Sequence, residues 1–476
     1  MANSFFIDFH CHPTLKPYGR SFAHEKVNSP NPKDNNSIFH YNPPTLLDKL
    51  LNMSSTLTRF SQSGISALVK GNVKVIGVSL SPIERGFFSG RLGTGCFSNA
   101  LSNFITGVGK DRVESIRKNN DYFADLQSEY QYLEQLNGVP VDGEQTKMQY
   151  KLVRNVDQVK ENASNQNVET ISMILAIEGL HVFDSYVNRR AEEHEILANV
   201  EKLKSWKYKP FYISPGHHFY NQMCGHAKSL SGFLERILDQ TYGMNTEFTS
   251  LGWVVLDKLL DNTNHDRIHI DVKHMSLKSR KQYYSYLRNK PDVPIIVSHG
   301  GVNGLASIEN KQTATDNGDN IFNKSELNFF DDEIILISDS RGIFCIQLDE
   351  RRIADRKILK KTSLNLSKKK MLDGKSGLVW NQIRHIAEIL DKNGRAAWNI
   401  AALGSDFDGV VDPLNGFWTS EEFPSLAENL LNHAKEYIRH DGKKLIMPEN
   451  RYADPEEIVK NVMCDNIMAF LQNHFR

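Results

Sequence analysis

Eight short apolar runs recur along the chain, and each is typical of a buried β-strand. The runs are Phe5–Phe9, Val73–Leu80, Ile171–Ile177, Phe211–Ser214, Ile268–Val272, Val293–Ser298, Gly342–Leu348 and Ile400–Leu403. The segments between them are long enough for helices, and several carry apolar residues at helical spacing. Strands that alternate with helices predict a parallel sheet in an α/β fold. Eight such units predict a (β/α)8 barrel of the TIM type with long inserted loops.

Helical patterns are clearest at Thr45–Phe60, Asp121–Leu136, Arg190–Trp206, Ser250–Leu260, Pro424–Ile438 and Pro455–Phe475. Ser250 is expected to cap the helix that ends at Leu260, and Ser276 or Ser279 is expected to cap a further helix. Polar, loop-like sequence predicts insertions near 14–44, 84–165 and 350–376. We therefore expect residues 1–476 to form a single barrel domain with these insertions.

The composition argues against several classes of protein. The chain has 57 basic and 57 acidic residues, a balance that gives no indication of a nucleic-acid or membrane partner. Its five cysteines are scattered without a CxxC pair, which argues against a disulfide scaffold or a thiolate zinc site. No signal peptide and no apolar run of bilayer length is evident, so we expect a cytoplasmic protein. The basic run Arg351–Lys375 is predicted to be a solvated insertion rather than a nucleic-acid site.

Chemically active side chains follow directly after the predicted strands. Histidines follow four strands and acids follow two more, namely His10, His12, His217, His218, His274 and His299, and Glu178, Asp406 and Asp408. In a (β/α)8 barrel the C-terminal strand ends converge at one rim, where the active site lies. Alternation along a strand places His10 and His12 on one face, and it is expected to turn Lys273 away from the face of His274.

This combination of residues suits metal-assisted hydrolysis. Imidazoles and carboxylates favour a divalent ion, most of all Zn²⁺. The five candidate ligands, His10, His12, Glu178, His274 and His299, are too many for one catalytic zinc ion that keeps an open position. Two ions bridged by Glu178 use all five. Such a pair can share a bridging hydroxide as nucleophile and polarise the scissile carbonyl, and Asp406 can then carry the proton to the leaving group.

The motifs that contain these residues occur in a characteristic order. They are DFHCHP, LAIEGLH, YISPGHHFYN, IDVKHMS, PIIVSHGG and ALGSDFDG. This series resembles the membrane (renal) dipeptidase family of the amidohydrolase superfamily, and the segment Asn466–Phe470 matches as well. The resemblance implies a zinc-dependent metallopeptidase that cleaves a peptide or amide bond in a small, dipeptide-like substrate, and it suggests a homodimer.

The resemblance also implies roles for single residues. His10, His12 and Glu178 would hold one metal ion, and Glu178, His274 and His299 would hold the other. Asp406 would be the catalytic proton shuttle. Either His217 or His218 would contact the oxygen of the tetrahedral intermediate, and the spacing to Asn221 favours His217. His218 and Asn221 are further substrate-binding candidates.

Three departures from the family pattern leave the substrate open. His12 stands where the family usually has Asp, and Leu180 follows Gly179 where a second glycine is usual. The family's arginine that clamps the substrate carboxylate is expected shortly after His299, yet residues 300–327 contain no arginine and only two cations, Lys311 and Lys324. Lysine lacks the bidentate fork of arginine, so one of Arg351, Arg352 or Arg356 is a candidate replacement.

Two other functions are compatible with the sequence. A deacetylase or lactonase of the same superfamily would use the same metal site on a different scissile bond. A catalytically silent barrel would serve as a binding module. The complete set of candidate ligands, together with Asp406, favours an enzyme over the silent barrel.

Overall fold

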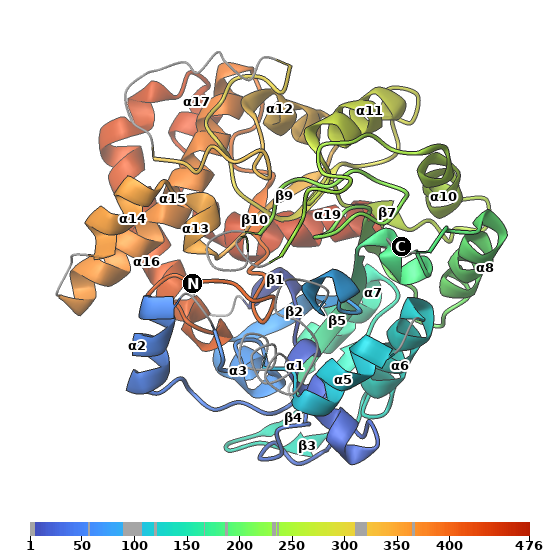
Figure 1. The fold of residues 1–476 in the computed structure, drawn as a ribbon. Helices are drawn as coiled ribbons and strands as arrows, with labels where there is room; N and C mark the ends of the chain where they lie inside the picture. The colour runs from blue at the N-terminus through green and yellow to red at the C-terminus, as the bar shows by residue number, and fades with distance from the viewer. Residues whose placement is uncertain are drawn as a thin grey trace.

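The computed structural model describes residues 5–55, 58–88, 107–118, 121–165, 167–185, 189–230, 235, 238–309, 321–363 and 367–476. Each of the eight apolar runs contains a parallel strand, which confirms the strand prediction. These strands are β1 (Phe6–Cys11), β2 (Val73–Leu80), β5 (Glu169–Glu178), β6 (Tyr212–Ser214), β7 (His269–Ile270), β8 (Ile296–Gly300), β9 (Ile343–Ile346) and β10 (Ala401–Leu403). Figure 1 shows them at the centre of the molecule with helices around them.

Hydrogen bonds join these strands into a ring. One sheet contains β1, β2, β5, β6 and β7, and the other contains β8, β9 and β10. At one seam the N–H of Val272 donates to the carbonyl of Ile296 over 2.9 Å. At the other seam the N–H of Asp406 donates to the carbonyl of His10, also over 2.9 Å. The two sheets therefore meet at both edges, as the (β/α)8 prediction requires.

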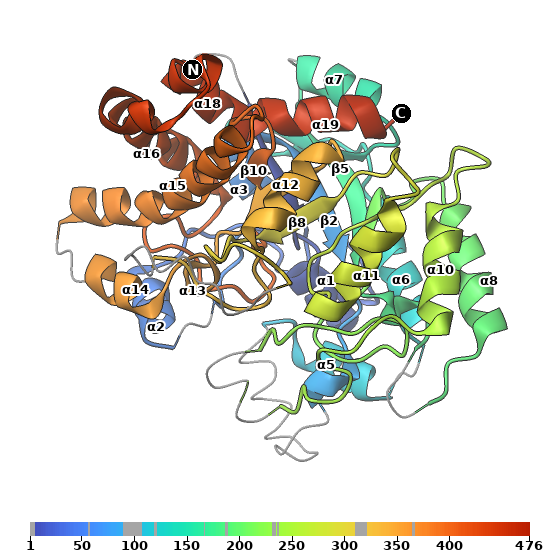
Figure 2. The same cartoon turned by 90° about the horizontal axis from the view of Figure 1, so that it is seen from above.

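Helices surround this ring, as Figures 1 and 2 show. They are α1 (Leu15–Ser21), α2 (Leu46–Ser55), α3 (Ile65–Lys70), α5 (Lys110–Lys118), α6 (Tyr122–Glu134), α7 (Val156–Ser164), α8 (Glu193–Lys204), α10 (Ser250–Leu260), α11 (Leu277–Leu287), α12 (Asp331–Asp339), α13 (Glu350–Ile353), α14 (Arg356–Ser363), α15 (Lys368–Lys392), α16 (Phe423–Glu436), α17 (Pro448–Arg451), α18 (Pro455–Lys460) and α19 (Asn466–His474). Ser276 caps α11 through its side chain, as predicted, whereas Thr249 rather than Ser250 caps α10.

The barrel interior is filled by inward-facing apolar side chains and closed at one end by the C-terminal helix. Ile7, Phe9, Val75 and Tyr212 belong to one buried cluster with residues of α19. The ring of Phe470 packs edge-on against that of Phe9, with centroids 6.0 Å apart. The amino-terminal half of the barrel is therefore a packed core, and the opposite rim is the one at which (β/α)8 barrels carry their active sites.

The three predicted insertions contain more regular structure than their polar sequences indicate. Residues 14–44 were expected to be a long loop, yet α1 lies within them, with Lys16 and Tyr18 buried. Residues 84–165 contain α5, α6 and α7, and a short hairpin of β3 (Val141–Asp142) and β4 (Lys147–Leu152) that extends β5. Residues 350–376 contain α13, α14 and the start of α15. Buried ion pairs anchor some of these segments, such as Lys16 Nζ to Asp408 at 2.8 Å.

A buried carboxyl in α6 gives the first testable prediction. Glu129 is 2% exposed and accepts a 2.5 Å hydrogen bond from Thr14 Oγ1, and burial raises its pKa to about 7. Between the pH values at which Glu129 ionises in the unfolded and folded states, the folded protein binds more protons. Stability should therefore fall as pH rises from about 4.5 to about 7. This decrease in the free energy of unfolding is up to about 3 kcal/mol, and it should be absent in the Glu129→Gln variant, which has no carboxyl to ionise at this position.

The measurement is the free energy of unfolding from urea titrations at pH 5 and pH 8. The control is Glu161→Gln, which changes an exposed carboxylate in α7. Equal pH dependence in wild type and the Glu129→Gln variant would contradict the assignment of a protonated carboxyl.

No helix among the residues that the structure describes has the length and apolar character needed to cross a membrane.

Candidate metal centre

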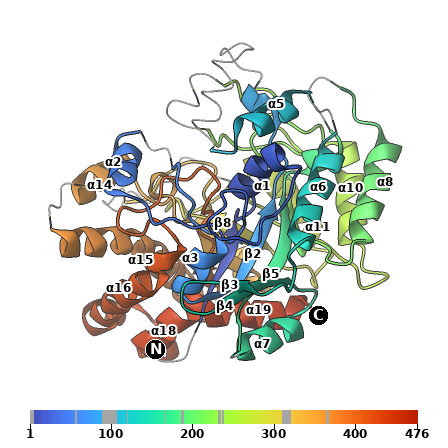
Figure 3. The same ribbon diagram turned by 90° about the horizontal axis from the view of Figure 1, so that it is seen from below.

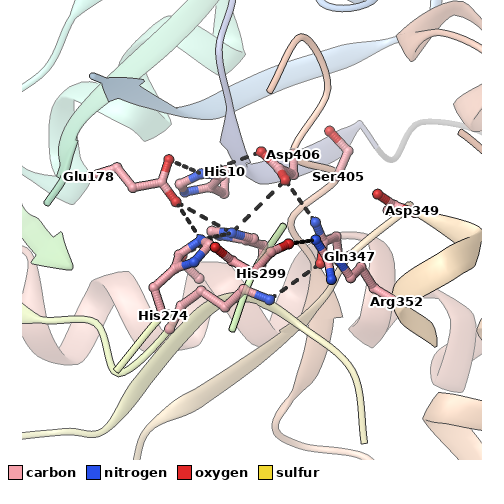
Figure 4. A network of polar contacts seen from close by, with 12 residues as sticks. His10, Glu178, His274, His299, Gln347, Asp349, Arg352, Ser405 and Asp406 are labelled. Carbon is pink, nitrogen blue, oxygen red and sulfur yellow. Dashed lines mark hydrogen bonds and ion pairs between the residues drawn. The ribbon is translucent and has the colours of Figure 1, made fainter. Parts of the chain in front are cut away.

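The candidate ligands converge at the open rim of the barrel. His10 belongs to β1, Glu178 ends β5 and His299 lies in β8, while His12 and His274 follow the ends of β1 and β7. All five side chains are buried, none more than 6% exposed. Figure 4 shows the carboxylate of Glu178 pointing toward His10, His274 and His299, with dashed lines to these imidazoles. Residues separated by up to 289 positions in the sequence (His10 and His299) thus share one site.

The two carboxylate oxygens of Glu178 face different pairs of histidines. Oε2 lies 3.8 Å from Nε2 of His10 and 3.3 Å from Nε2 of His12. Oε1 lies 3.0 Å from Nε2 of His274 and 3.5 Å from Nε2 of His299. Each set of three ligand atoms is close enough to surround one cation. The carboxylate is therefore placed to bridge two neighbouring cation positions.

Neighbouring groups fix which nitrogen of His10 and of His299 faces the centre. Tyr212 donates its O–H to the carbonyl of Phe9 over 2.7 Å. Toward Nδ1 of His10, 3.2 Å away, its oxygen can therefore act only as an acceptor, so Nδ1 carries the proton. Ser298 donates to Asp271 in the same way, and its oxygen lies 2.9 Å from Nδ1 of His299. Protons on both Nδ1 atoms leave the Nε2 lone pairs directed at the centre, the orientation that a metal ligand needs.

Two buried carboxylates behind the ligands hold the strand ends together. Asp271 accepts hydrogen bonds from the hydroxyls of Ser214 and Ser298, over 2.5 and 2.6 Å, and so links β6 to β8. Asp8 in β1 accepts the N–H of Ser405 over 2.8 Å and links β1 to the loop after β10. These links fix the relative positions of the segments that carry the candidate ligands.

The ionisation states of four of the five candidate ligands match those of metal ligands, and His12 is the exception. Burial lowers the pKa of His10 and His299, and it lowers the pKa of His274 to about 3. Burial works against ionisation of Glu178, but His217 and the other imidazoles around it hold its pKa well below the usual value. Metal binding requires neutral imidazoles and an ionised carboxylate. In addition, Nε2 of His10 is buried without a hydrogen-bond partner among the described residues, so the cluster fits a cation.

Asp406 lies at the edge of the cluster with its carboxylate held from two sides. Oδ1 is 3.2 Å from Nε2 of His12, and Oδ2 accepts a 2.7 Å hydrogen bond from the side-chain amide of Gln347. Burial raises the pKa of Asp406, against the effect of His12. Burial also disfavours a charge on His12, but the contacts with Asp406 and Glu178 raise its pKa to about 10. Asp406 is thus a carboxylate at a pocket wall whose affinity for a proton is increased.

Asp408, which the sequence grouped with Asp406 after the last strand, has a structural environment instead. It is 2% exposed and accepts hydrogen bonds from the N–H groups of Gln62 and Ser63 as well as from Lys16. Asp406 and Asp408 both have positive φ angles, 60° and 67°, in the loop after β10, and their carboxylates contact different partners, Gln347 and Lys16.

A pocket opens on the cluster and combines apolar and charged walls. Its apolar lining includes Leu15, Ile83, Phe87, Leu230, Leu327 and Val411. Glu178, His217, His218, His274 and Asp406 line the same pocket. A small molecule held here would contact the candidate metal ligands and Asp406 at the same time.

The predicted substrate-binding residues after β6 have different environments. His217 lies between two acids, with Nε2 3.6 Å from Glu178 and Nδ1 2.8 Å from Oε2 of Glu84. His218 turns its Nδ1 to the hydroxyl of Ser229 at 2.7 Å. Asn221 does not line the pocket, because its amide donates to the carbonyl of Pro215 and its oxygen accepts the N–H groups of Met223 and Cys224. The structure therefore gives Asn221 a role in folding the loop.

Sequence reasoning missed Glu84, which is 3% exposed. It accepts the N–H of Phe219 over 2.9 Å in addition to its contact with His217. Burial opposes its ionisation, but the charge of His217 lowers its pKa to about 2. Glu84 stands four residues beyond the end of β2, the second of the eight strands. The criterion that selected Glu178, an acid that follows a strand, would have found it.

The expectation for Lys273 was wrong. Regular alternation ends with β7 at Ile270, and the chain then turns, with His274 at a φ of 64°. Lys273 therefore lines the same pocket as His274, is 1% exposed, and donates to Oε1 of Gln347 over 3.3 Å. Gln347, which also holds Asp406, was missed as well, although it lies at the end of the seventh apolar run.

Of the three arginines considered as replacements for the missing clamp, Arg351 and Arg352 line the pocket and Arg356 lies exposed on α14. Arg351 is paired with Asp349 over 2.6 Å. Arg352 donates to the carbonyl of Ser229 and has no carboxylate within ion-pair distance among the described residues. Lys324 is exposed, and Lys311 lies outside the described residues.

Comparisons with known proteins place the chain by its fold. No protein-family model matches the sequence, and no curated protein does. Among solved structures it is similar to a dipeptidase described as a metallopeptidase of family M19, with 11% identity and a TM-score of 0.54 over 99% of this chain and 98% of that chain. It is similar as well to the probable dipeptidase PvdM from Pseudomonas aeruginosa, with 11% identity and a TM-score of 0.55 over 99% and 95% of the two chains. The predicted fold is thereby confirmed, because the chain shares the (β/α)8 fold of these two structures over nearly its whole length.

Proposed function

We propose that this protein is a binuclear metal-dependent hydrolase that cleaves a peptide or amide bond in a small substrate. The observation that carries the proposal is the position of Glu178, whose two oxygens face separate pairs of histidines. His10, His12 and Glu178 would hold one divalent ion, and Glu178, His274 and His299 the other, with zinc as the preferred metal. Two structures of the same fold are described as dipeptidases, which supports a dipeptide-like substrate.

The two ions would supply a water molecule of lowered pKa and would polarise the scissile carbonyl. The chain's own residues do the remaining work. Asp406, held by Gln347, accepts the proton of the attacking water and passes it to the leaving amine. His217, whose Nε2 lies 3.6 Å from Glu178, donates a hydrogen bond from Nε2 to the carbonyl oxygen as negative charge develops there.

The metal dependence and the reaction can be tested together. A chelator should remove the metal and the activity, and Zn²⁺ should restore both at about two ions per chain, measured by elemental analysis. The reconstituted enzyme should be assayed against dipeptides, N-acyl amino acids and lactones. Hydrolysis of only the second or third group would identify the deacetylase or lactonase alternative. Lack of both metal binding and hydrolysis would favour a binding module. The cytoplasmic location and the homodimer stay predictions.

Glu84 is expected to position His217, because its carboxylate contacts Nδ1 and so fixes the direction of Nε2. Glu84→Gln should lower kcat about 10–100-fold with a smaller change in KM, as for other groups that orient an active-site imidazole. Steady-state kinetics on the metal-loaded enzyme measure this, with Glu129→Gln as a control for the loss of a buried carboxylate away from the pocket. An unchanged kcat would show that His217 needs no such support.

Arg352 is expected to bind an anionic group of the substrate. It lines the pocket and has no carboxylate partner among the described residues, whereas Arg351 is already paired. Arg352→Ala should raise KM for substrates with a free carboxylate about 10–100-fold and leave their neutral amide analogues unaffected. Arg356→Ala, on exposed α14, is the matched control. The same effect on both substrate forms would argue against a carboxylate contact.

A further inference from the structure

Helix α2 has its apolar face turned toward solvent. Leu46, Leu47, Leu50 and Leu51 are 75%, 66%, 53% and 40% exposed, and Met53 is 54% exposed. The spacing i, i+1, i+4, i+5 places the four leucines on one side of the helix. A stable surface helix normally buries such a stripe, so a face of this kind indicates a binding surface.

The opposite side of α2 is polar and faces the protein. Asn52 is completely buried and donates from its side-chain amide to Thr58 Oγ1 over 3.1 Å. Thr58 in turn donates to the carbonyl of Val411 over 2.7 Å, at the loop that lines the pocket. The polar contacts fix α2 in this orientation, and the leucines point outward as a consequence.

A second helix exposes positive charge with the same spacing. Arg356, Lys357, Lys360 and Lys361 on α14 are exposed, while Ile358 and Leu359 on its other side pack against the core. Lys368, Lys369 and Lys370 at the start of α15 are exposed as well. The sequence has no acidic residue from 356 to 372, so this side of the molecule carries a concentrated positive charge.

The two helices lie at the same corner of the molecule. Figures 1, 2 and 3 show α2 and α14 next to each other at the edge, away from the centre of the barrel. The helix that exposes leucines therefore lies near a helix that exposes cations. We call α2 together with the exposed cations of α14 and the start of α15 the apolar–basic surface.

We propose that the apolar–basic surface docks the protein on the surface of an anionic phospholipid membrane. A helix that places leucines into the interface, beside lysines that contact acidic head groups, matches the two components of such a membrane surface. Nucleic acid would satisfy the cations but would leave the leucines in water. A second copy of this chain, paired through the same surface by a twofold axis, would bring the two sets of cations together. The sequence alone gave no indication of this partner, because the charges of the whole chain balance.

Co-sedimentation of the intact protein with vesicles tests the proposal. Binding to phosphatidylcholine vesicles that contain about a third phosphatidylserine should be at least about tenfold stronger than to pure phosphatidylcholine, and it should weaken in 0.5 M salt. The double variant Leu46→Ser and Leu50→Ser should lower the partition coefficient about tenfold or more. The double variant Lys360→Glu and Lys361→Glu should do the same.

Matched controls lie outside the apolar–basic surface. Ile446→Ser changes an apolar residue that is 65% exposed, and the double variant Lys278→Glu and Lys392→Glu reverses two exposed cations elsewhere. Both should bind vesicles as wild type does. Because the substituted residues are exposed, the variants should fold as wild type does, and thermal unfolding of each variant checks this.

Three results would overturn the proposal. The first is no binding to acidic vesicles, or binding that the leucine variant leaves unchanged. The second is a dimer in light scattering that the leucine variant dissociates, which would make the surface a contact between copies. The third is duplex DNA or RNA bound with wild-type affinity by the leucine variant. None of these readouts depends on hydrolytic activity, so the outcome is independent of the proposed function.

Discussion

Glu178→Gln is expected to abolish turnover and to reduce the metal content from two ions per chain. The carboxylate of Glu178 contacts Nε2 of His12 through one oxygen and Nε2 of His274 through the other. An amide carries no charge to offset two dications, and its nitrogen cannot act as a ligand. Without the metal ions the enzyme would lose the activated water and the polarisation of the scissile carbonyl. This removes several kcal/mol of transition-state stabilisation, so the rate should fall at least about 10³-fold.

Elemental analysis and a zinc titration of the purified variant measure the first effect, and steady-state kinetics measure the second. The matched control is Glu333→Gln, which changes a buried carboxylate that pairs with Arg280 outside the metal cluster. The control should lower stability and leave two ions bound. Two tightly bound ions in the Glu178→Gln variant would remove the bridging role and the binuclear assignment with it.

Asp406→Asn is expected to leave the metal content unchanged and to lower kcat about 10²–10⁴-fold, the usual contribution of a general acid–base group. Asparagine keeps the shape of the side chain and can still pair with Gln347, so the pocket should not change. It cannot accept a proton from water. Kinetics and metal analysis on the same preparation separate the loss of proton transfer from the loss of a ligand.

Asp408→Asn is the matched control, because Asp408 stands two residues away in the same loop. Its carboxylate pairs with buried Lys16 and accepts backbone N–H groups from the loop before α3. The substitution leaves a buried cation unpaired and should cost about 3–5 kcal/mol of stability, a structural effect. If Asp406→Asn turned over substrate as fast as wild type, Asp406 would have no part in proton transfer.

The eight strands were predictable because a central parallel sheet is buried on both faces. Its strands are therefore continuous apolar runs, such as Val73–Leu80, that contrast with the polar segments around them. The position of His10, Glu178, His274 and His299 directly after or at the end of such runs was predictable for a related reason. Parallel strands in a barrel all end at the same rim, so residues at strand ends meet whatever their separation in the sequence.

The errors arose where the backbone leaves the regular strand. Lys273 was expected to point away from His274, but the strand ends at Ile270 and a turn follows, so period-two alternation no longer applies. Asn221 was grouped with His217 by its spacing in the sequence, yet its amide closes the loop. Helix α1 was missed because Lys16 suggests an exposed loop until its partner, Asp408, is known.

By itself, the sequence determined the order of strands and helices and the chemical groups at the strand ends, because burial and periodicity leave a local pattern. Only the tertiary structure decided that Glu178 lies between two pairs of histidines, that Glu84 supports His217, and that Arg352 rather than Arg351 lacks a carboxylate partner among the described residues. It also decided that the leucines of α2 face outward and that α2 lies near the basic helix α14. These features depend on which distant residues become neighbours, and hydrophobic periodicity carries no information about such contacts.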